Sequence, residues 1–155
     1  DLNENDIKRI TNELRKAVTP SIKKNRLFIQ KHCSKILIFS GGFKEIIIPI
    51  VSEYGINEDQ IFANEFIYDS DGNVIGIDKN NNMSKKSGKI LMIKSLNLSG
   101  NIDVIGDGFN DYEIKESGLA TNFYAFIENI NREEISQLSD KVLNSFDDYI
   151  DIAND

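Results

Sequence analysis

The stretch at residues 104–112, Val-Ile-Gly-Asp-Gly-Phe-Asn-Asp-Tyr, constrains the fold of this chain more than any other. The mainly apolar residues 102–105 predict a buried parallel strand, and the glycines beside Asp107 allow a tight turn with space for a ligand. Asp107 and Asp111 are four residues apart, so a helix that begins near Asn110 would bring both carboxylates above the carboxyl end of the strand. Carboxylate oxygens at that edge suit Mg²⁺. The alternative is an Asp-Gly turn followed by a helix cap.

Composition limits the class of protein and its partners. A chain of 155 residues is about one domain long, and its net charge of −7 argues against a nucleic-acid partner, because clustered Lys and Arg hold phosphate backbones. The single cysteine, Cys33, cannot form an internal disulfide, which fits a reducing compartment. No apolar stretch approaches the ~20 residues that cross a bilayer, and the first residues lack the features of a signal peptide. We therefore expect a cytoplasmic protein without a membrane partner.

Helical and strand patterns alternate along the chain. Residues 4–17 predict an amphipathic helix, and Thr19-Pro20 begins a second helix that runs to about Lys31. A short strand at 35–39 stops at Ser40-Gly41-Gly42 and is followed by a helix from 43 to 54, which Gly55 ends. Further on, the patterns predict helices at 87–96, 111–117, 131–138 and 146–150, and strands from 102, from 118 and at 123–126.

Residues 61–77 predict a β-hairpin, because two stretches of strand-forming residues, 61–68 and 74–77, flank an Asp-Gly turn. Elsewhere strands alternate with helices, which implies a mainly parallel sheet with helices on both faces. The predicted fold class is therefore α/β, Rossmann-like, with an added hairpin.

Two more candidate sites follow predicted strands. Ser40-Gly41-Gly42 would open a helix, whose free backbone N–H groups and a small hydroxyl form an anion site; an ordinary serine cap is the alternative. Lys89 lies in the first turn of the next helix, where its positive charge interacts unfavourably with the helix dipole at a cost of ~0.3–1 kcal/mol in stability. A bound anion would offset that cost, whereas the alternative is a solvated surface lysine. Together with Asp107, these residues supply a phosphate cradle, a cation and a metal-binding carboxylate.

In these motifs the chain resembles the haloacid dehalogenase-like phosphatases, and within them the phosphoserine phosphatase group. Ser40-Gly41-Gly42-Phe43 is similar to the second motif of that group, and Gly106-Asp107-Gly108-Phe109-Asn110-Asp111 to its last motif. The hairpin also matches, and so does the tail Phe123-Tyr124-Ala125-Phe126 with Arg132 beyond it. The resemblance covers nearly the whole chain from about Val18 onward.

The resemblance implies a magnesium-dependent phosphatase that converts O-phosphoserine into serine and phosphate through an aspartyl-phosphate, as in serine biosynthesis. It assigns Mg²⁺ to Asp107, and catalytic roles to Lys89, Asp107 and Asp111, with Asp111 orienting Lys89 or a metal-bound water. The residues that it assigns to the small phosphorylated substrate are Ser40, Gly41, Gly42, Lys89 and Asn110. Lys86 is the alternative to Lys89 as the phosphate lysine.

One motif of the family has no counterpart in this chain. Catalysis in the family begins with Asp-x-Asp-x-Thr after the first strand, and the only similar spacing, Asp69-Ser70-Asp71, falls in the predicted hairpin turn. In the family's sheet that first strand lies between the strands that precede Ser40 and Asp107. We expect the gap to be filled by closing of these strands, by another chain or, as we favour, by a missing N-terminal segment of the same protein.

The expected domain organisation follows from this absence. Residues 1–32 would be a helical remnant of the cap and of its link to the core, and residues 33–155 a single core domain of the haloacid dehalogenase-like type, part of a longer protein. This chain alone would then be inactive. A catalytically inactive phosphate- or metal-binding regulatory module and a receiver-type domain are the alternatives. His32 and Cys33 are interpreted as structural residues.

Overall fold

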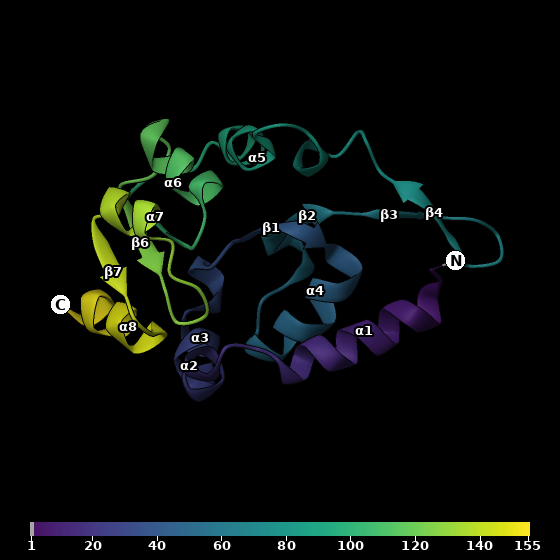
Figure 1. Cartoon of the computed structure of the whole chain (residues 1–155), viewed down its shortest axis with the longest axis horizontal. Helices are drawn as coiled ribbons and strands as arrows, with labels where there is room; N and C mark the ends of the chain where they lie inside the picture. Colours follow the sequence, from purple (N-terminus) through teal and green to yellow (C-terminus); the bar gives the residue numbers. More distant parts are fainter. Residues whose placement is uncertain (1) are drawn as a thin grey trace. The chain divides into compact units, whose positions relative to one another are not determined.

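The computed structural model describes residues 2–155, which form two compact units. Unit 1 contains the residues up to Val18 together with Arg26–Gly88, and unit 2 contains Thr19–Asn25 and Lys89–Asp155. Helices, parallel strands and one antiparallel hairpin confirm the α/β class (Figure 1). Neither unit begins at residue 33, and the division into a 1–32 segment and a 33–155 core stays a prediction. Within residues 2–155 no helix is both long and apolar enough to cross a membrane.

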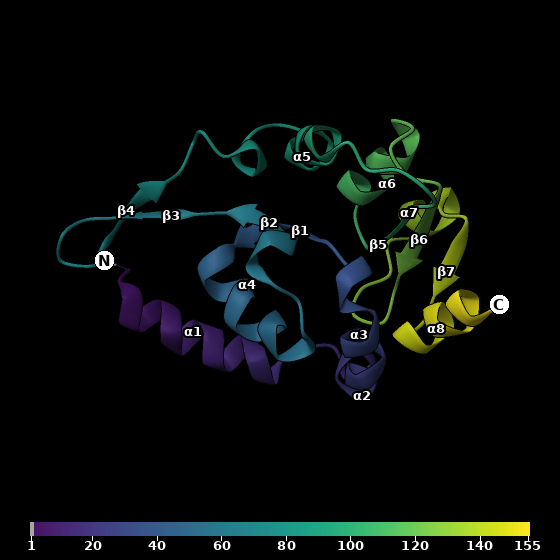
Figure 2. The ribbon, with the colours of Figure 1, turned by 180° about the vertical axis from the view of Figure 1, so that it is seen from behind.

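In unit 1, helix α1 (Glu4–Lys16) confirms the helix predicted at 4–17. Asn3 caps it, because its side chain accepts hydrogen bonds from the backbone of Asn5 and Asp6, while the Asp6 carboxylate accepts one from the backbone of Asn3. The helix buries Ile7 and lies alongside α4 (Lys44–Val51) in both views (Figures 1 and 2).

The predicted helix from Pro20 to about Lys31 is wrong as a single element. Helix α2 (Pro20–Lys24) ends at Asn25, and α3 (Arg26–His32) follows, so the chain passes from unit 2 into unit 1 at this break. The Asn25 amide donates hydrogen bonds to the Ser21 carbonyl at 2.8 Å and to Asp147 at 3.0 Å. A polar contact with a residue far along the chain therefore ends the helix. A 3₁₀ turn, η1 (Cys33–Lys35), follows α3.

Strand β1 (Ile38–Phe43) continues through Ser40-Gly41-Gly42, where the sequence predicted that it would stop. It pairs in parallel with β2 (Ile61–Asn64), Phe39 opposite Phe62 and Phe43 opposite Asn64, so three residues of β1 face one of β2. The Ser-Gly-Gly motif is therefore a bulge inside the strand. Helix α4 begins after Phe43, and the short turn η2 (Ser52–Tyr54) ends at Gly55, whose φ of 80° confirms the predicted C-cap.

The predicted hairpin is confirmed for β3 (Phe66–Tyr68) and β4 (Val74–Ile77), which pair antiparallel. Residues 61–64 do not belong to it, since they pair with β1. Asp69 closes the turn by accepting hydrogen bonds from the backbone N–H groups of Asp71 and Asn73, and the bonds from Asn73 lower the pKa of Asp69. The aspartates with the spacing of a catalytic pair thus lie in a turn. The remaining elements of unit 1 are η3 (Glu58–Gln60) and η4 (Asn82–Ser84).

Unit 2 contains a parallel sheet in the order β5 (Asp103–Gly106), β6 (Asn122–Phe126), β7 (Lys141–Leu143). Its core is Phe123, Ala125 and Ile135, against which Val104 and Tyr112 pack. Strand β7 was not predicted, and the strand expected from Gly118 is a turn, since Gly118 has a φ of 80°. The helices, all close to their predicted positions, are α5 (Gly88–Leu96), α6 (Phe109–Glu116), α7 (Glu133–Leu138) and α8 (Phe146–Asn154).

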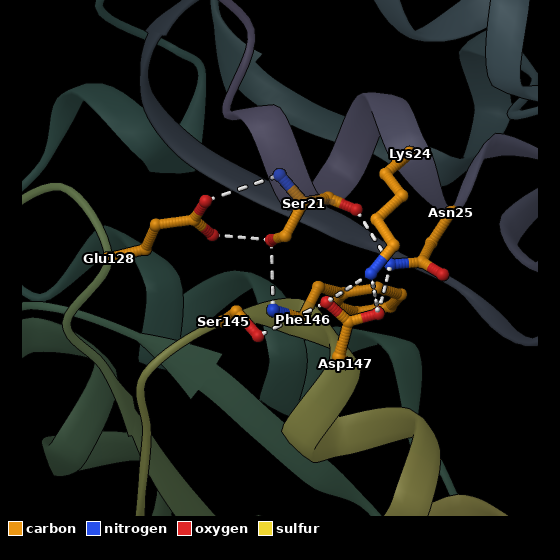
Figure 3. Close-up of polar contacts among 7 residues, drawn as sticks. All are labelled: Ser21, Lys24, Asn25, Glu128, Ser145, Phe146 and Asp147. Atoms are coloured by element: carbon orange, nitrogen blue, oxygen red, sulfur yellow. Dashed lines mark hydrogen bonds and ion pairs between the residues drawn. The ribbon is translucent and has the colours of Figure 1, made fainter.

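Residues 19–25 reach unit 2 from the N-terminal part of the chain and bind the start of α8 (Figure 3). The buried Ser21 donates its backbone N–H and its hydroxyl to the two oxygens of Glu128, and its hydroxyl oxygen accepts a hydrogen bond from the backbone of Phe146 at 2.9 Å. Lys24 and Asn25 both contact Asp147, and the hydrogen bond from Asn25, followed by that from Lys24, lowers the pKa of Asp147. This network fastens α2 to α8.

Tyr149 makes the stability of unit 2 decrease at alkaline pH. Its hydroxyl donates to Asp103 at 3.1 Å, and burial, followed by the Asp103 charge, raises the pKa of Tyr149 to about 12. The folded state favours the neutral phenol, so this contribution is complete below the ordinary tyrosine pKa of about 10 and is lost as the pH rises to about 12.

Replacing Tyr149 with phenylalanine should therefore flatten the decrease in the free energy of unfolding between pH about 10 and about 12, measured by urea denaturation followed with probes in unit 2. Asp103→Asn should flatten it only in part, because burial, the larger cause of the raised pKa, remains when the Asp103 charge is removed. An unchanged slope in Tyr149→Phe would contradict this origin of the pH dependence.

Candidate active site

The Gly-Asp-Gly loop joins β5 to α6 in unit 2. Gly108 is the N-cap of α6, and its backbone N–H donates to Asp111 Oδ2 at 3.1 Å. The helix begins at Phe109, close to the predicted start. The Asp111 side chain lies directly against Gly106: a Cβ on that glycine would lie 2.6 Å from Asp111 Cβ and closer still to its carboxylate. Gly106 is therefore required by the position of Asp111.

Lys89 and Asp111 form an ion pair with 2.6 Å between Lys89 Nζ and Asp111 Oδ1. The two side chains are 20% and 14% exposed, so the pair is largely withdrawn from water. Lys89 lies in the first turn of α5, where the helix dipole disfavours a positive charge, and the Asp111 carboxylate offsets this effect. Lys86, the alternative phosphate lysine, is exposed in the turn before α5 and makes no hydrogen bond or ion pair with residues 2–155.

Asp107 forms a second, more open ion pair with Arg132. Nη1 of Arg132 lies 2.6 Å from Asp107 Oδ2 and 2.9 Å from the Asp107 carbonyl oxygen, and each side chain is 48% exposed. Arg132 is the N-cap of α7, which follows β6. Because β5 and β6 are parallel neighbours, the residues that follow them meet at one edge of the sheet.

A cavity of about 480 Å³ collects four of the predicted site residues, Lys89, Asp107, Asn110 and Asp111. Their roles in binding and catalysis stay predictions. Gly108 and Phe109, which also line the cavity, belong to the motif singled out in the sequence, whereas no role was predicted for the remaining lining residues, Arg132, Glu134 and Ile135. Arg132 had been noted only as part of the tail that matches the family pattern.

Ser40, Gly41 and Gly42 lie in unit 1, at the bulge of β1. Ser40 Oγ accepts a hydrogen bond from the Gly42 N–H at 3.0 Å, which leaves the hydroxyl hydrogen free to donate to an anion. The Asn64 amide fixes the bulge from β2 by donating to the Gly41 carbonyl at 2.9 Å. A Cβ on Gly41 would meet nothing within 4 Å, so a ligand can approach the backbone there. The predicted cradle is thus a strand bulge instead of a helix N-terminus.

Asp107 has the chemistry of a magnesium ligand. Its Oδ2 pairs with Arg132, whereas its Oδ1 makes no hydrogen bond within residues 2–155 and remains available as a hard oxygen donor. Asp111 is already engaged by Lys89 and by the Gly108 N–H. No group of three or more His, Cys, Asp or Glu in the described part of the chain could enclose a metal ion. The residues present therefore fit Mg²⁺ as one ligand of a larger set.

No family model matches the sequence. The chain is similar to a solved structure, that of a phosphoserine phosphohydrolase-like protein from Francisella tularensis. The two superpose with a TM-score of 0.80 at 31% sequence identity, over 97% of this chain and 70% of that one. The chain belongs to the phosphoserine phosphatase-like family of haloacid dehalogenase-like proteins. The family resemblance predicted from the two sequence motifs is therefore confirmed.

Curated relatives of this phosphoserine phosphatase-like chain are similar over only part of their length. The chloroplastic phosphoserine phosphatase of Arabidopsis thaliana is 30% identical over 118 residues, which are 74% of this chain and 40% of that protein. Human phosphoserine phosphatase is 27% identical over 132 residues, 83% of this chain and 58% of that protein. The chain thus spans about half the length of these relatives.

Proposed function

We propose that this chain is part of a magnesium-dependent phosphomonoester hydrolase that converts O-phosphoserine, or a closely similar substrate, into serine and phosphate, in the cytoplasm and as a step of serine formation. The observation that carries the proposal is the cavity in which Lys89, Asp107, Asn110 and Asp111 meet. The relatives named phosphoserine phosphatase support the choice of substrate.

The side chains of this chain would bind and orient the phosphoryl group. In unit 2 the Lys89 ammonium would donate to its oxygens, and the family resemblance assigns the same role to the Ser40 hydroxyl and the Gly41 backbone of unit 1. Preorganised donors of this kind supply much of the stabilisation of a transition state. Asp111 holds the Lys89 ammonium from one side while its other oxygen is fixed by the Gly108 N–H, so the lysine is positioned before substrate arrives. Asn110 would contact the phosphate. Asp107 would ligate Mg²⁺, which when bound would neutralise charge on the transferring group.

The attacking carboxylate would come from a segment outside residues 1–155, because the chain has no Asp-x-Asp-x-Thr motif. Attack by such a carboxylate on phosphorus would release the alcohol and form an aspartyl-phosphate, which water would hydrolyse. The partial coverage of the relatives supports this origin. So do β1 and β5, each of which is bonded to a neighbour on one side only within its own unit, since the open edge can pair with a further strand.

The test is to read the coding sequence upstream of residue 1 and to assay the extended chain for phosphate release from phosphoserine. We expect an Asp-x-Asp-x-Thr motif upstream and magnesium-dependent activity. In the extended chain, Asp107→Asn should lower kcat by at least about 100-fold, whereas Asp151→Asn, on the exposed side of α8, serves as the control and should leave it unchanged.

Residues 1–155 alone should release no phosphate. Magnesium-dependent release by this piece would contradict the proposed origin of the nucleophile. If the upstream sequence lacks the motif, the catalytically inactive phosphate- or metal-binding module of the same fold is the better account.

A further inference from the structure

The two ion pairs that face the cavity differ in how firmly they are held. Asp111 is bound on both oxygens, by Lys89 and by the Gly108 N–H, and is 14% exposed. Asp107 is bound on one oxygen only, by Arg132, and both of these side chains are 48% exposed. An ion pair of this exposure contributes ~0–1 kcal/mol and exchanges readily with other partners. The Lys89 pair is thus a fixed part of the cavity wall, whereas the Arg132 pair is exchangeable.

We propose that Arg132 is an internal counter-ion of Asp107 that competes with the divalent cation and is released into the cavity when the cation binds. The proposal rests on the proposed function, since it assumes that Asp107 is a cation ligand. Arg132 is suited to this role because it starts from the N-cap of α7, on the same sheet edge as Asp107, and reaches both the carboxylate and the carbonyl oxygen of that residue with one nitrogen.

The competition follows from charge and space. A cation on the free Oδ1 and the guanidinium 2.6 Å from Oδ2 would place two positive charges on one carboxylate, and these charges repel each other. Within residues 2–155 Arg132 forms no ion pair with another carboxylate, so in the absence of a cation the guanidinium neutralises Asp107. Once released, it keeps its place in the cavity lining together with Lys89 and Asn110. There it presents a planar set of donors that suits a phosphate or a carboxylate.

The experiment is a Mg²⁺ titration of residues 1–155 followed by NMR of the Gly106 and Gly108 amides and of the Arg132 side-chain N–H. A cation held by few carboxylates binds weakly, with a Kd on the order of 10⁻³ M or above. In the natural chain the amides and the Arg132 signal should shift with one midpoint. Arg132→Gln should move the midpoint of the amide shifts to a cation concentration at least about threefold lower, because the competing charge is gone. Arg132→Met, the second variant, removes the same charge and should move the midpoint in the same direction.

Lys141→Gln is the matched control, because it removes one exposed positive charge of unit 2 outside the cavity lining; its midpoint should equal that of the natural chain. Equal midpoints in the natural chain and in both Arg132 variants would overturn the inference and leave the metal site at Asp107 intact. If the amides respond in none of the chains, or respond equally in Asp107→Asn, the metal role of Asp107 fails and the inference fails with it.

Discussion

Replacing Gly106 with alanine should lower the free energy of unfolding of unit 2 by about 3–5 kcal/mol. The new Cβ would overlap the whole Asp111 side chain, including its Cβ at 2.6 Å, and that short side chain cannot turn away without moving α6. Overpacking of this kind costs about 1–3 kcal/mol. Displacement of Asp111 adds the loss of its bonds to Lys89 and to the Gly108 N–H, which leaves a largely buried lysine without its partner.

Gly108→Ser is the matched control, since the Cβ at that position would lie 3.5 Å from Asp111 Oδ2, an ordinary contact, and serine is a good N-cap residue. The measurement is amide hydrogen exchange of β6, a probe inside unit 2, because a chain of two units need not unfold in one step. Similar protection in Gly106→Ala and Gly108→Ser would show that Asp111 tolerates a side chain at Gly106 and would contradict the prediction.

The loop that carries Asp107 could be predicted from the sequence because its signals are local. An apolar strand, two glycines and an Asn-Asp pair within ten residues fix both the turn and the start of α6, and Lys89 lies near the start of its own helix. The position of Lys89 beside Asp111 was expected only from the family resemblance. Spacing alone does not show that the start of α5 and the start of α6 meet, since that contact depends on the packing of the sheet.

The features that were missed depend on contacts between distant residues. The Ser-Gly-Gly bulge exists because pairing with β2 resumes at Phe43, and the residues around Ser40 do not indicate the register between β1 and β2. The break at Asn25 is stabilised by Asp147, 122 residues later in the chain. Strand β7 has only three residues, of which Leu143 alone is fully buried. It is therefore too short to show the alternation of apolar and polar residues by which a strand is recognised. Arg132 was missed as a site residue because its partner Asp107 follows a neighbouring strand.

The ion pair between Lys89 and Asp111 should show a coupling energy of about 1–3 kcal/mol in a double-mutant cycle of Lys89→Met and Asp111→Asn. Each single change leaves the other group in a cavity wall where the side chains are only 14–20% exposed, without its partner. In Asp111→Asn the new amide can still accept from the Gly108 N–H, so the loss reports the contact with Lys89. The double variant buries neither charge and should be less destabilised than the sum of the two singles.

The exposed pair between Glu13 and Lys16 of α1 is the control for this cycle, because its N–O distance of 2.8 Å is similar whereas its side chains are 68% and 73% exposed. Solvent screens such a pair, and its coupling should be about 0.2–0.5 kcal/mol. Equal coupling in the two pairs would mean that burial adds nothing at the cavity, and that Asp111 does not fix Lys89. A clearly larger coupling energy in the cavity pair would support Asp111 as the residue that positions the Lys89 ammonium for an incoming phosphoryl group. The same contact that stabilises unit 2 also restricts where the lysine can point.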